Sequence, residues 1–269
     1  MEVKRNAASL FISQTKYAID LLQKFDMAGA KECSSPVPVN STLKAGDGEL
    51  LSNPTMYKSL VSASKYLTWT RPEISYAINQ VCQFIHSPTS DHLIAAKRIL
   101  SYIKGTLDYG ILFSKGLLAV HGFSDEDWAR DPETRKSTSG YCIFFGSNPV
   151  SWSSKRQSTV ARSSTEAEYR SLANSAAELM WICQLLKDLE VVQAKNLSIQ
   201  YICTVDQVAD IFTKELAGPR FGYLCNKLMV FPAGNLNLRG GNTTVNSHAL
   251  NSLTISIVNY FVVPSGGNQ

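Results

Sequence analysis

The most regular pattern of apolar positions runs from Ser163 to Leu189, where such residues recur every three or four positions. Ser163 followed three residues later by Glu166 forms a capping-box sequence, which predicts that a helix begins here. Helical spacing places Glu168 on the apolar stripe and directs Glu166 elsewhere. The stripe consists of Leu172, Ala176, Leu179, Cys183 and Leu186. The sequence therefore predicts one long helix on which the carboxylate of Glu168 points towards the buried side.

Glu168 has two interpretations at this point. An ionised carboxylate that faces a core is costly unless it is paired or binds a metal, which makes Glu168 a candidate site residue. The alternative is a first-turn acid that is stabilised by the helix dipole and reaches water. The helix sequence by itself leaves both open.

The N-terminal part of the chain shows mainly helical periodicity. A weakly alternating stretch, 2–12, is a candidate strand, and 33–54 is linker-like because it is rich in Pro, Gly and Ser. Thr70 with Glu73 forms a second capping-box sequence, and Gly105 suits the position after a helix. The predicted helices span residues 13–25, 54–69, 72–86 and 90–104. We expect the last three to pack together.

Beyond Leu117 the period changes from helical to alternating, which is typical of strands. Gly146-Ser147-Asn148 separates two of these strands as a hairpin-type turn. The predicted strands span residues 118–124, 141–145, 149–153 and 197–204. A last helix, capped by Asp206, is expected to run to Leu216. Strands followed by helix, strand and helix indicate an α/β unit.

After Pro232 the composition shifts to Asn, Gly, Ser and Thr, with Arg239 as the one Asp, Glu, Lys or Arg residue. An apolar run at 253–263 is shorter than a membrane span and is interrupted by Ser256 and Asn259. We therefore expect residues 232–269 to be a disordered or appended tail, and we expect no membrane partner.

Composition changes this picture only slightly. The 269 residues are 44% hydrophobic and 18% charged, which is ordinary for a globular protein with a sizeable core. A net charge of +4 is compatible with nucleic-acid binding but too small to indicate it. Six cysteines without CxxC spacing, and no secretory signal, indicate reduced thiols and an intracellular protein, cytoplasmic or nuclear. The start of the chain leads directly into strand-like sequence, which suggests a piece of something longer.

Three acids are expected to meet at one end of the predicted sheet. Asp125 ends the first strand, Glu168 faces inward from the long helix, and Asp210 lies in the first turn of the last helix. Carboxylates arranged in this way can hold two hard cations that activate water and stabilise the leaving oxygen of a phosphodiester. The alternatives are that Asp125 and Asp127 are turn residues at a strand end, and that Asp210 is a first-turn acid.

Several of these segments together resemble the ribonuclease H domain of copia-type LTR retrotransposon Pol polyproteins. An upstream part resembles the segment that joins reverse transcriptase to ribonuclease H in the same polyproteins, and the resemblance covers roughly Val3 to Arg239. The domain segments are Gly122–Trp128, Arg135–Tyr141, Trp152–Gln157, Ser163–Tyr169 and Val208–Lys214, and the upstream segments are Tyr66–Glu73 and Ala96–Leu100.

The resemblance implies an α/β fold: an incomplete ribonuclease H-like mixed sheet with flanking helices, preceded by a small helical connection region. It also implies Mg²⁺-dependent, or Mn²⁺-dependent, cleavage of the RNA strand in RNA–DNA hybrids. The family's strand-end Asp, helix Glu and final Asp map onto Asp125, Glu168 and Asp210. The expected domains are the end of a reverse transcriptase-like region (1–32), a linker (33–53), the connection (54–116), the ribonuclease H-like domain (117–231) and the tail (232–269).

Two departures from the family limit these expectations. The strand that ends in a Cys-Asp-Asn motif, and the helix after it, are missing between the long helix and Leu197, so one metal-binding Asp is absent. The polymerase palm is missing as well, and we expect no polymerase activity. Three carboxylates should bind Mg²⁺ weakly, and the sequence leaves open whether cleavage is weak or absent.

A second function class is a non-catalytic nucleic-acid-binding module. Basic side chains on one helix and around the sheet could follow the phosphates of a hybrid, and the alternative is that they are solvated surface charges. These residues are Lys97, Arg98, Lys104, Arg135, Lys136, Lys155, Arg156 and Arg162. An untranslated or unfolded relic also stays open, as does the oligomeric state.

The deletion leads to one further prediction about the sheet. The strand at 197–204 is expected to move into the vacated position, parallel to and beside 118–124, which gives a four-stranded sheet. This shift would bring Asp206 towards Asp125 and Glu168, so that Asp206 becomes a candidate substitute ligand. The alternative is that Asp206 only caps the last helix.

Overall fold

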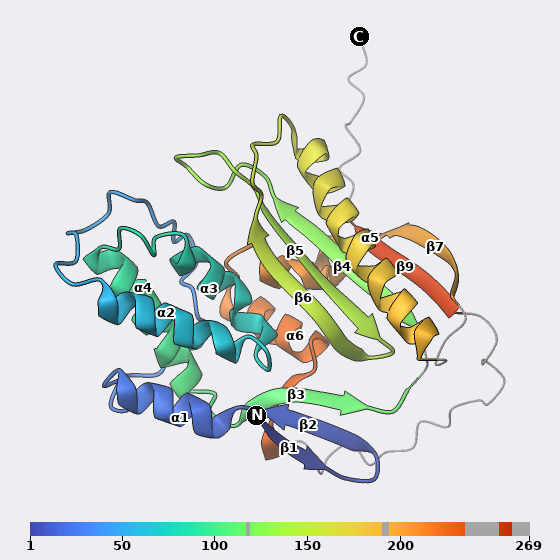
Figure 1. Cartoon of the computed structure of the whole chain (residues 1–269), viewed down its shortest axis with the longest axis horizontal. Helices are drawn as coiled ribbons and strands as arrows, with labels where there is room; N and C mark the ends of the chain where they lie inside the picture. Colours follow the sequence, from blue (N-terminus) through green and yellow to red (C-terminus); the bar gives the residue numbers. More distant parts are fainter. Residues whose placement is uncertain (117–118, 190–193, 235–252, 260–269) are drawn as a thin grey trace. The chain divides into compact units, whose positions relative to one another are not determined.

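The computed structural model describes residues 1–116, 119–189, 194–234 and 253–259 of the chain (Figure 1). These residues form two compact units. The first unit contains residues 1–116, 147–149 and 214–234. The second unit contains residues 119–146, 150–189, 194–213 and 253–259. Among the described residues, no helix is both long and apolar enough to cross a membrane.

Four helices and a turn of the first unit lie close to the predicted helices. They are α1 (Thr15–Lys24), α2 (Thr55–Leu67), the 3₁₀ turn η1 (Pro72–Ile74), α3 (Ser75–Cys82) and α4 (Ser90–Lys104), and the unit also contains α6 (Gly218–Lys227). The second capping box is wrong, because Arg71 precedes η1 and Thr70 donates its hydroxyl hydrogen bond to the Gln14 side chain instead. Helices α2, α3 and α4 contact one another, which confirms the predicted packing.

The first unit also contains a four-stranded antiparallel sheet. Its strands follow the order β1 (Glu2–Arg5), β2 (Ser9–Ser13), β3 (Tyr109–Ser114) and β8 (Val230–Pro232). The predicted strand 2–12 is therefore a hairpin of two strands. Strands β3 and β8 and helix α6 were not predicted, because each is short and draws its partners from distant parts of the sequence.

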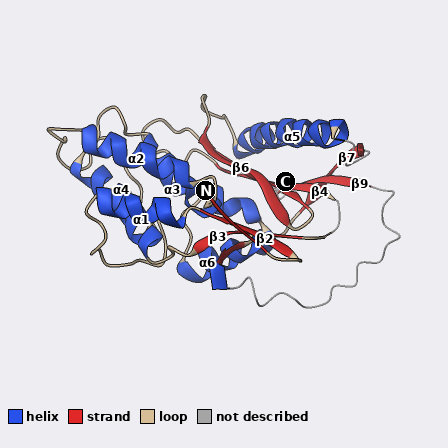
Figure 2. Ribbon diagram, turned by 60° about the horizontal axis from the view of Figure 1, so that its bottom comes forward, coloured by secondary structure: helices blue, strands red, loops and turns tan. Residues whose placement is uncertain are grey.

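The second unit is a mixed five-stranded sheet with one long helix. The order across the sheet is β6 (Asn148–Arg156), β5 (Thr138–Phe145), β4 (Val120–Asp127), β9 (Leu253–Asn259) and β7 (Ala194–Tyr201). Helix α5 (Ser164–Asp188) lies along one face of this sheet, as Figure 2 shows. Its buried residues form a core with two strand residues, and Ala176 and Leu186 pack against that core. The core residues are Val120, Ile143, Leu172, Leu179, Ile182 and Cys183. The predicted helix and its inward stripe are confirmed.

The predicted closure of the sheet is wrong. Strand β9 occupies the position beside β4 and pairs with it in parallel, from Val120 opposite Ile255 to Phe123 opposite Val258. Strand β7 pairs with the other edge of β9. The run Leu253–Asn259 is rich in Ile, Val and Thr, which suit a strand, and it supplies backbone partners to two neighbours at once. The expectation of a disordered tail therefore fails for these residues; 235–252 and 260–269 lie outside the described residues.

The last predicted helix is also different. Residues 206–216 do not form one α-helix, because two short 3₁₀ turns, η2 (Thr204–Asp206) and η3 (Val208–Phe212), occupy this region. Gln207 caps η3, with its side-chain oxygen accepting a hydrogen bond from the Ala209 amide (3.2 Å). The chain extends again after Asp206, at Gln207, which prevents a continuous helix.

Candidate carboxylate site

Asp125 is almost fully buried near the end of β4, and its contacts are dictated by the alternation of the strand. One carboxylate oxygen accepts a hydrogen bond from the hydroxyl of Thr213 (2.5 Å), which follows η3. Gly140 lies opposite Asp125 on β5, and a Cβ atom at Gly140 would collide with Phe212 and Thr213. The Asp125 side chain therefore points to the sheet face that η3 covers.

The next residue, Glu126, points to the other face of the sheet. Val120, Gly122 and Ser124 share its alternation, and they contact α5: Val120 belongs to the core with α5, and Ser124 bonds to Ser171 (3.1 Å between hydroxyl oxygens). The Glu126 side chain is therefore on the α5 side of the strand. The charges of Asp125 and Glu168 both act on it.

Glu126 occupies an electrostatically unfavourable environment. The pKa of its carboxyl group is raised to about 8, chiefly by burial and then by the nearby charges of Asp125, Glu168 and Asp127, while a hydrogen bond from Ser137 opposes this shift. Its Oε2 is buried without a hydrogen-bond partner among the described residues. The charge of Glu168 is therefore close enough to raise the pKa of Glu126.

Hydrogen bonds fix the end of β4 against α5 and the 3₁₀ region. The Ser171 hydroxyl donates to the backbone carbonyl oxygen of Asp125 (2.8 Å), and the side-chain amide of Gln207 donates to the backbone carbonyl oxygen of Ser124 (3.0 Å). These bonds satisfy backbone acceptors at the end of the strand. They hold three chain segments around Asp125.

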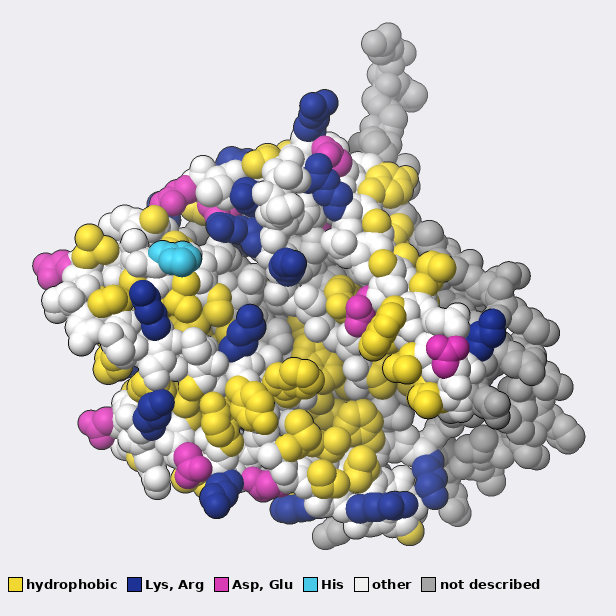
Figure 3. All heavy atoms as spheres, viewed as in Figure 1, with side chains coloured by type: hydrophobic (Ala, Val, Ile, Leu, Met, Phe, Trp, Pro, Cys, Tyr) yellow, Lys and Arg dark blue, Asp and Glu magenta, His cyan; other side chains and the backbone are white. Residues whose placement is uncertain are grey.

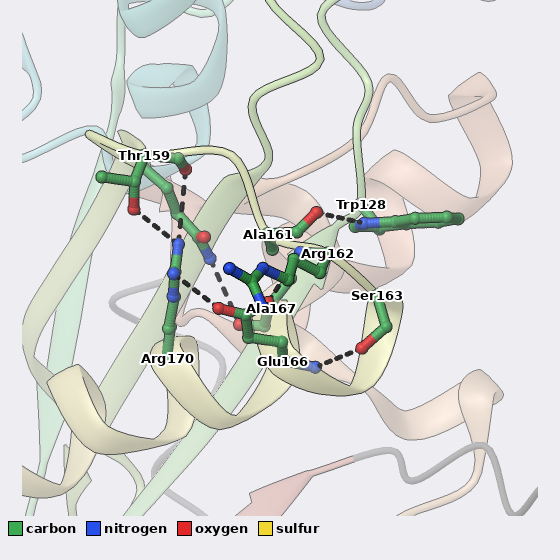
Figure 4. Close-up of polar contacts among 9 residues, drawn as sticks. Trp128, Thr159, Ala161, Arg162, Ser163, Glu166, Ala167 and Arg170 are labelled. Carbon is green, nitrogen blue, oxygen red and sulfur yellow. Dashed lines mark hydrogen bonds and ion pairs between the residues drawn. The ribbon is translucent and has the colours of Figure 1, made fainter.

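The first turn of α5 is held by its own polar network (Figure 4). The Ser163 hydroxyl accepts a hydrogen bond from the Glu166 amide (3.1 Å), which confirms the predicted N-cap. The Glu166 carboxylate accepts a bond from the Arg162 amide (2.6 Å) and pairs with Arg170 (2.6 Å). Arg170 also donates to the Thr159 hydroxyl (2.6 Å). Glu166 is therefore a capping and ion-pair residue, and the assignment of Glu168 to a site stays a prediction.

The other two predicted acids differ in their surroundings. Asp210 is buried in η3, and its carbonyl oxygen accepts a second bond from the Thr213 hydroxyl (3.3 Å), so Thr213 links it to Asp125. Asp206 is half-buried and accepts a hydrogen bond from the Cys203 thiol (3.4 Å). The candidate role of Asp206 depended on β7 pairing with β4, and that pairing is replaced by β9.

The acidic side chains do not assemble into a metal centre. Within the described parts of the chain, no three His, Cys, Asp or Glu side chains are grouped so that they could hold a metal ion. The described residues do not fit a bound pair of cations, and Mg²⁺ binding stays a prediction.

The predicted basic residues are divided between the two units. In the first unit, Arg98 donates to the Ser35 hydroxyl (3.4 Å) and Lys104 to the Ala30 carbonyl oxygen (2.6 Å), while Lys97 is half-buried on the same helix. In the second unit, Arg156 pairs with Asp131 (2.5 Å). The other four are Lys136, which is half-buried, and the exposed Arg135, Lys155 and Arg162.

Sequence reasoning missed two residues of this site. Glu126 could have been found by continuing the strand alternation one step beyond Ser124, since Val120, Gly122, Ser124 and Glu126 share a face. The contact of Thr213 with Asp125 spans 88 positions and has no local signal.

The fold and the site together define a two-unit α/β protein with buried acids at the end of a central strand. No family model matches the chain, and no solved structure matches it. It is 44% identical over 211 residues to the retrovirus-related Pol polyprotein from transposon RE1 of Arabidopsis thaliana, which is 76% of this chain and 14% of that polyprotein. The chain belongs to the family of copia-type retrotransposon Pol polyproteins.

Two shorter relatives match the chain over most of their own length. An uncharacterized mitochondrial protein of Arabidopsis thaliana is 46% identical over 182 residues, 67% of this chain and 75% of that protein. The secreted RxLR effector protein 161 of Plasmopara viticola is 44% identical over 128 residues, 47% of this chain and 90% of that protein. The chain thus matches only about a seventh of the Pol polyprotein from RE1 but most of these two proteins.

Proposed function

We propose that the second unit is an incomplete ribonuclease H-like domain whose Mg²⁺-dependent cleavage of RNA in RNA–DNA hybrids has been lost. The order of its acids along the chain, Asp125 on a strand, Glu168 on the long helix and Asp210 near the end, supports this descent. So does the arrangement of β4, β5 and β6 with α5 on one face.

The observation that supports the loss of activity is that, within the described residues, no three His, Cys, Asp or Glu side chains are grouped so that they could hold a metal ion. Asp125 accepts a hydrogen bond from Thr213, and the charge of Glu168 acts on Glu126. Cleavage by two cations requires carboxylates that converge on both ions, which stabilise the attacking and the leaving oxygen. Removing this support costs several kcal/mol of transition-state stabilisation, roughly a thousand-fold or more in rate.

A cleavage assay on a labelled RNA–DNA hybrid, with Mg²⁺ and then Mn²⁺, tests this proposal. We expect the intact chain to cut no faster than Asp125→Asn, Glu168→Gln and Asp210→Asn. Glu166→Gln is the matched control, since Glu166 serves the helix N-terminus. Cleavage by the intact chain that falls in the first three variants and persists in Glu166→Gln would overturn the proposal.

A second candidate function is binding of a nucleic-acid backbone without cleavage. Lys and Arg side chains gather in Figure 3 over the loop between β4 and β5 and over the segment that leads from β6 into α5. Arg135 in the first of these loops and Arg162 in the second segment are exposed, and so is Lys155 near the end of β6. Exposed cations of this kind can neutralise phosphates and release counterions, and the resulting affinity falls with salt.

A salt titration of hybrid binding tests this second function. We expect the double variant Arg135→Gln/Lys155→Gln to lower the slope of log affinity against log salt by about 1 to 2. The matched control is Lys31→Gln/Lys58→Gln, which removes two exposed charges from the first unit. Equal slopes for the two double variants would exclude a specific role for these loops.

A further inference from the structure

The first unit contains a cavity of about 730 Å³ whose lining residues all belong to this unit. It lies among α6, the C-terminal end of α4, strands β3 and β8, and the loop segment 32–34. Figures 1 and 2 show α6 beside β3. The volume is within the range of small-molecule sites in proteins, about 300–1,000 Å³. This space is here named the α6 cavity.

Aromatic rings from four different elements line the α6 cavity. Tyr102 of α4 and Phe221 of α6 meet edge to face, with their ring centroids 5.6 Å apart. Tyr109 of β3 and Phe231 of β8 supply the other two rings. Aromatic rings stack against one another in offset or edge-to-face arrangements, and a bound aromatic ligand can do the same. The walls therefore suit a flat ring system.

Glycines of α6 leave part of the α6 cavity open. Gly218 and Gly222 lie about one turn apart and line the cavity together with Phe221 and Cys225, on one side of the helix. A Cβ atom at Gly222 would meet no atom of the described residues within 4 Å, and the φ angle of Gly222 is not positive. Glycine inside a helix is destabilising. Neither packing nor backbone conformation therefore requires glycine at position 222, and the open space is free for a ligand.

The charge at the α6 cavity favours a cation. Glu32 is the one charged side chain among the described residues that line the cavity, and its carboxylate has no ion pair or hydrogen bond within the described chain. A Cβ atom at Gly105 would lie 3.5 Å from Oε2 of Glu32, which places this carboxylate at the C-terminal end of α4. The C-terminal end of a helix also attracts cations. An anion such as a phosphate is therefore disfavoured here.

A buried cation beside the aromatic walls is already paired. The guanidinium of Arg71 lies 5.6 Å from the ring centroids of Tyr102 and Tyr109. Its charge is balanced by the carboxylate of Glu73, at 2.6 Å. This pair leaves Glu32 as the unbalanced charge of the cavity lining.

We propose that the α6 cavity binds a flat aromatic ligand that carries a positive charge, with its ring system against the aromatic walls and its charge near Glu32. Stacking supplies the affinity for the ring system, and the carboxylate selects the cation over a neutral or anionic ligand of the same shape. This site depends neither on the proposed loss of cleavage nor on the binding of nucleic acid.

Equilibrium dialysis of the intact chain against thioflavin T, a flat aromatic cation, tests the site. We expect saturable binding of one molecule per chain. Glu32→Gln should lower this affinity about two- to five-fold, as for a partly exposed ion pair, and should leave the affinity for the uncharged analogue without the N-methyl group unchanged. Glu49→Gln, at an exposed position of the same unit, is the matched control. No saturable binding, or equal losses for the two probes in Glu32→Gln, would overturn the proposal.

Filling the open space tests the location of the site. We expect Gly222→Leu to lower the affinity for both probes about ten-fold or more, because the new side chain occupies part of the cavity. Urea unfolding should show equal or higher stability, since Leu favours a helix more than Gly does. Gly29→Leu is the matched control, because a Cβ atom there also meets no described atom within 4 Å and Gly29 lies outside the lining. Undiminished binding in Gly222→Leu, or an equal loss in the two variants, would overturn the proposal.

Discussion

At the scale of single residues, two neighbouring acids on β4 have opposite fates. The Asp125 carboxylate accepts a hydrogen bond from Thr213, while Glu126 is buried near the charge of Glu168 with one oxygen lacking a hydrogen-bond partner among the described residues. Because side chains alternate along β4, a difference of one position decides which of the two acids faces α5. A buried acid without compensation favours its neutral form.

Replacing Glu126 by Gln should make the second unit more stable at high pH. The pKa of about 8 in the folded protein lies above the ordinary value of about 4.3, so the stability that the protonated group contributes is present below pH 4 and is lost as the pH rises to 8. We expect Glu126→Gln to gain about 1–3 kcal/mol at pH 8 and little at pH 4.5, measured by urea unfolding without divalent metals.

The exposed Glu133 supplies the control for this measurement. Glu133→Gln should change stability by the same small amount at both pH values. A pH-independent effect of Glu126→Gln would contradict the assignment of a raised pKa to this carboxyl group.

At the scale of elements, the sequence predicts those helices and strands whose position a local pattern of residues determines. The inward stripe and the Ser163 cap specify α5, and the ends of α4 at Ser90 and Lys104 agree with the prediction. It does not predict β9, because the partners of Leu253–Asn259 are β4 and β7, and no local signal names a partner. For the same reason, the sequence does not predict that the Asp125 side chain points to the sheet face on which Thr213 lies.

Strand β9 should be essential to the second unit, since it pairs with a neighbour on each side. Ile257→Pro removes a backbone donor from a central strand, and we expect it to lower stability by about 3 kcal/mol or more. Hydrogen exchange should then show lost protection in β4 and β7. Ile257→Val, which keeps the donor, should lose little, and unchanged protection in Ile257→Pro would exclude β9 from the sheet.

At the scale of the whole molecule, the chain combines two units that each have their own sheet. The first unit contains a buried ion pair, Arg71 with Glu73 (2.6 Å), and Arg71 also donates to the carbonyl oxygen and hydroxyl of Thr106. This pair joins the turn before α3 to the end of α4.

Glu73→Gln should destabilise the first unit selectively. It leaves the Arg71 charge buried without compensation, which costs about 3–5 kcal/mol. We expect hydrogen exchange to accelerate in α2, α3 and α4 and to stay unchanged in β4 and β5. Glu49→Gln, at an exposed position of the same unit, is the control. Equal loss of protection in both units would mean that they unfold together.

Binding of Mn²⁺, counted by electron paramagnetic resonance on the intact chain, tests the central claim most directly. The claim is that Asp125, Glu168 and Asp210 do not form a metal centre able to cut a hybrid. The account predicts that the intact chain shows no saturable Mn²⁺ binding below about millimolar concentration, so that Asp125→Asn changes nothing in this range. One or two ions bound at micromolar concentration, and lost in Asp125→Asn and Glu168→Gln, would contradict it.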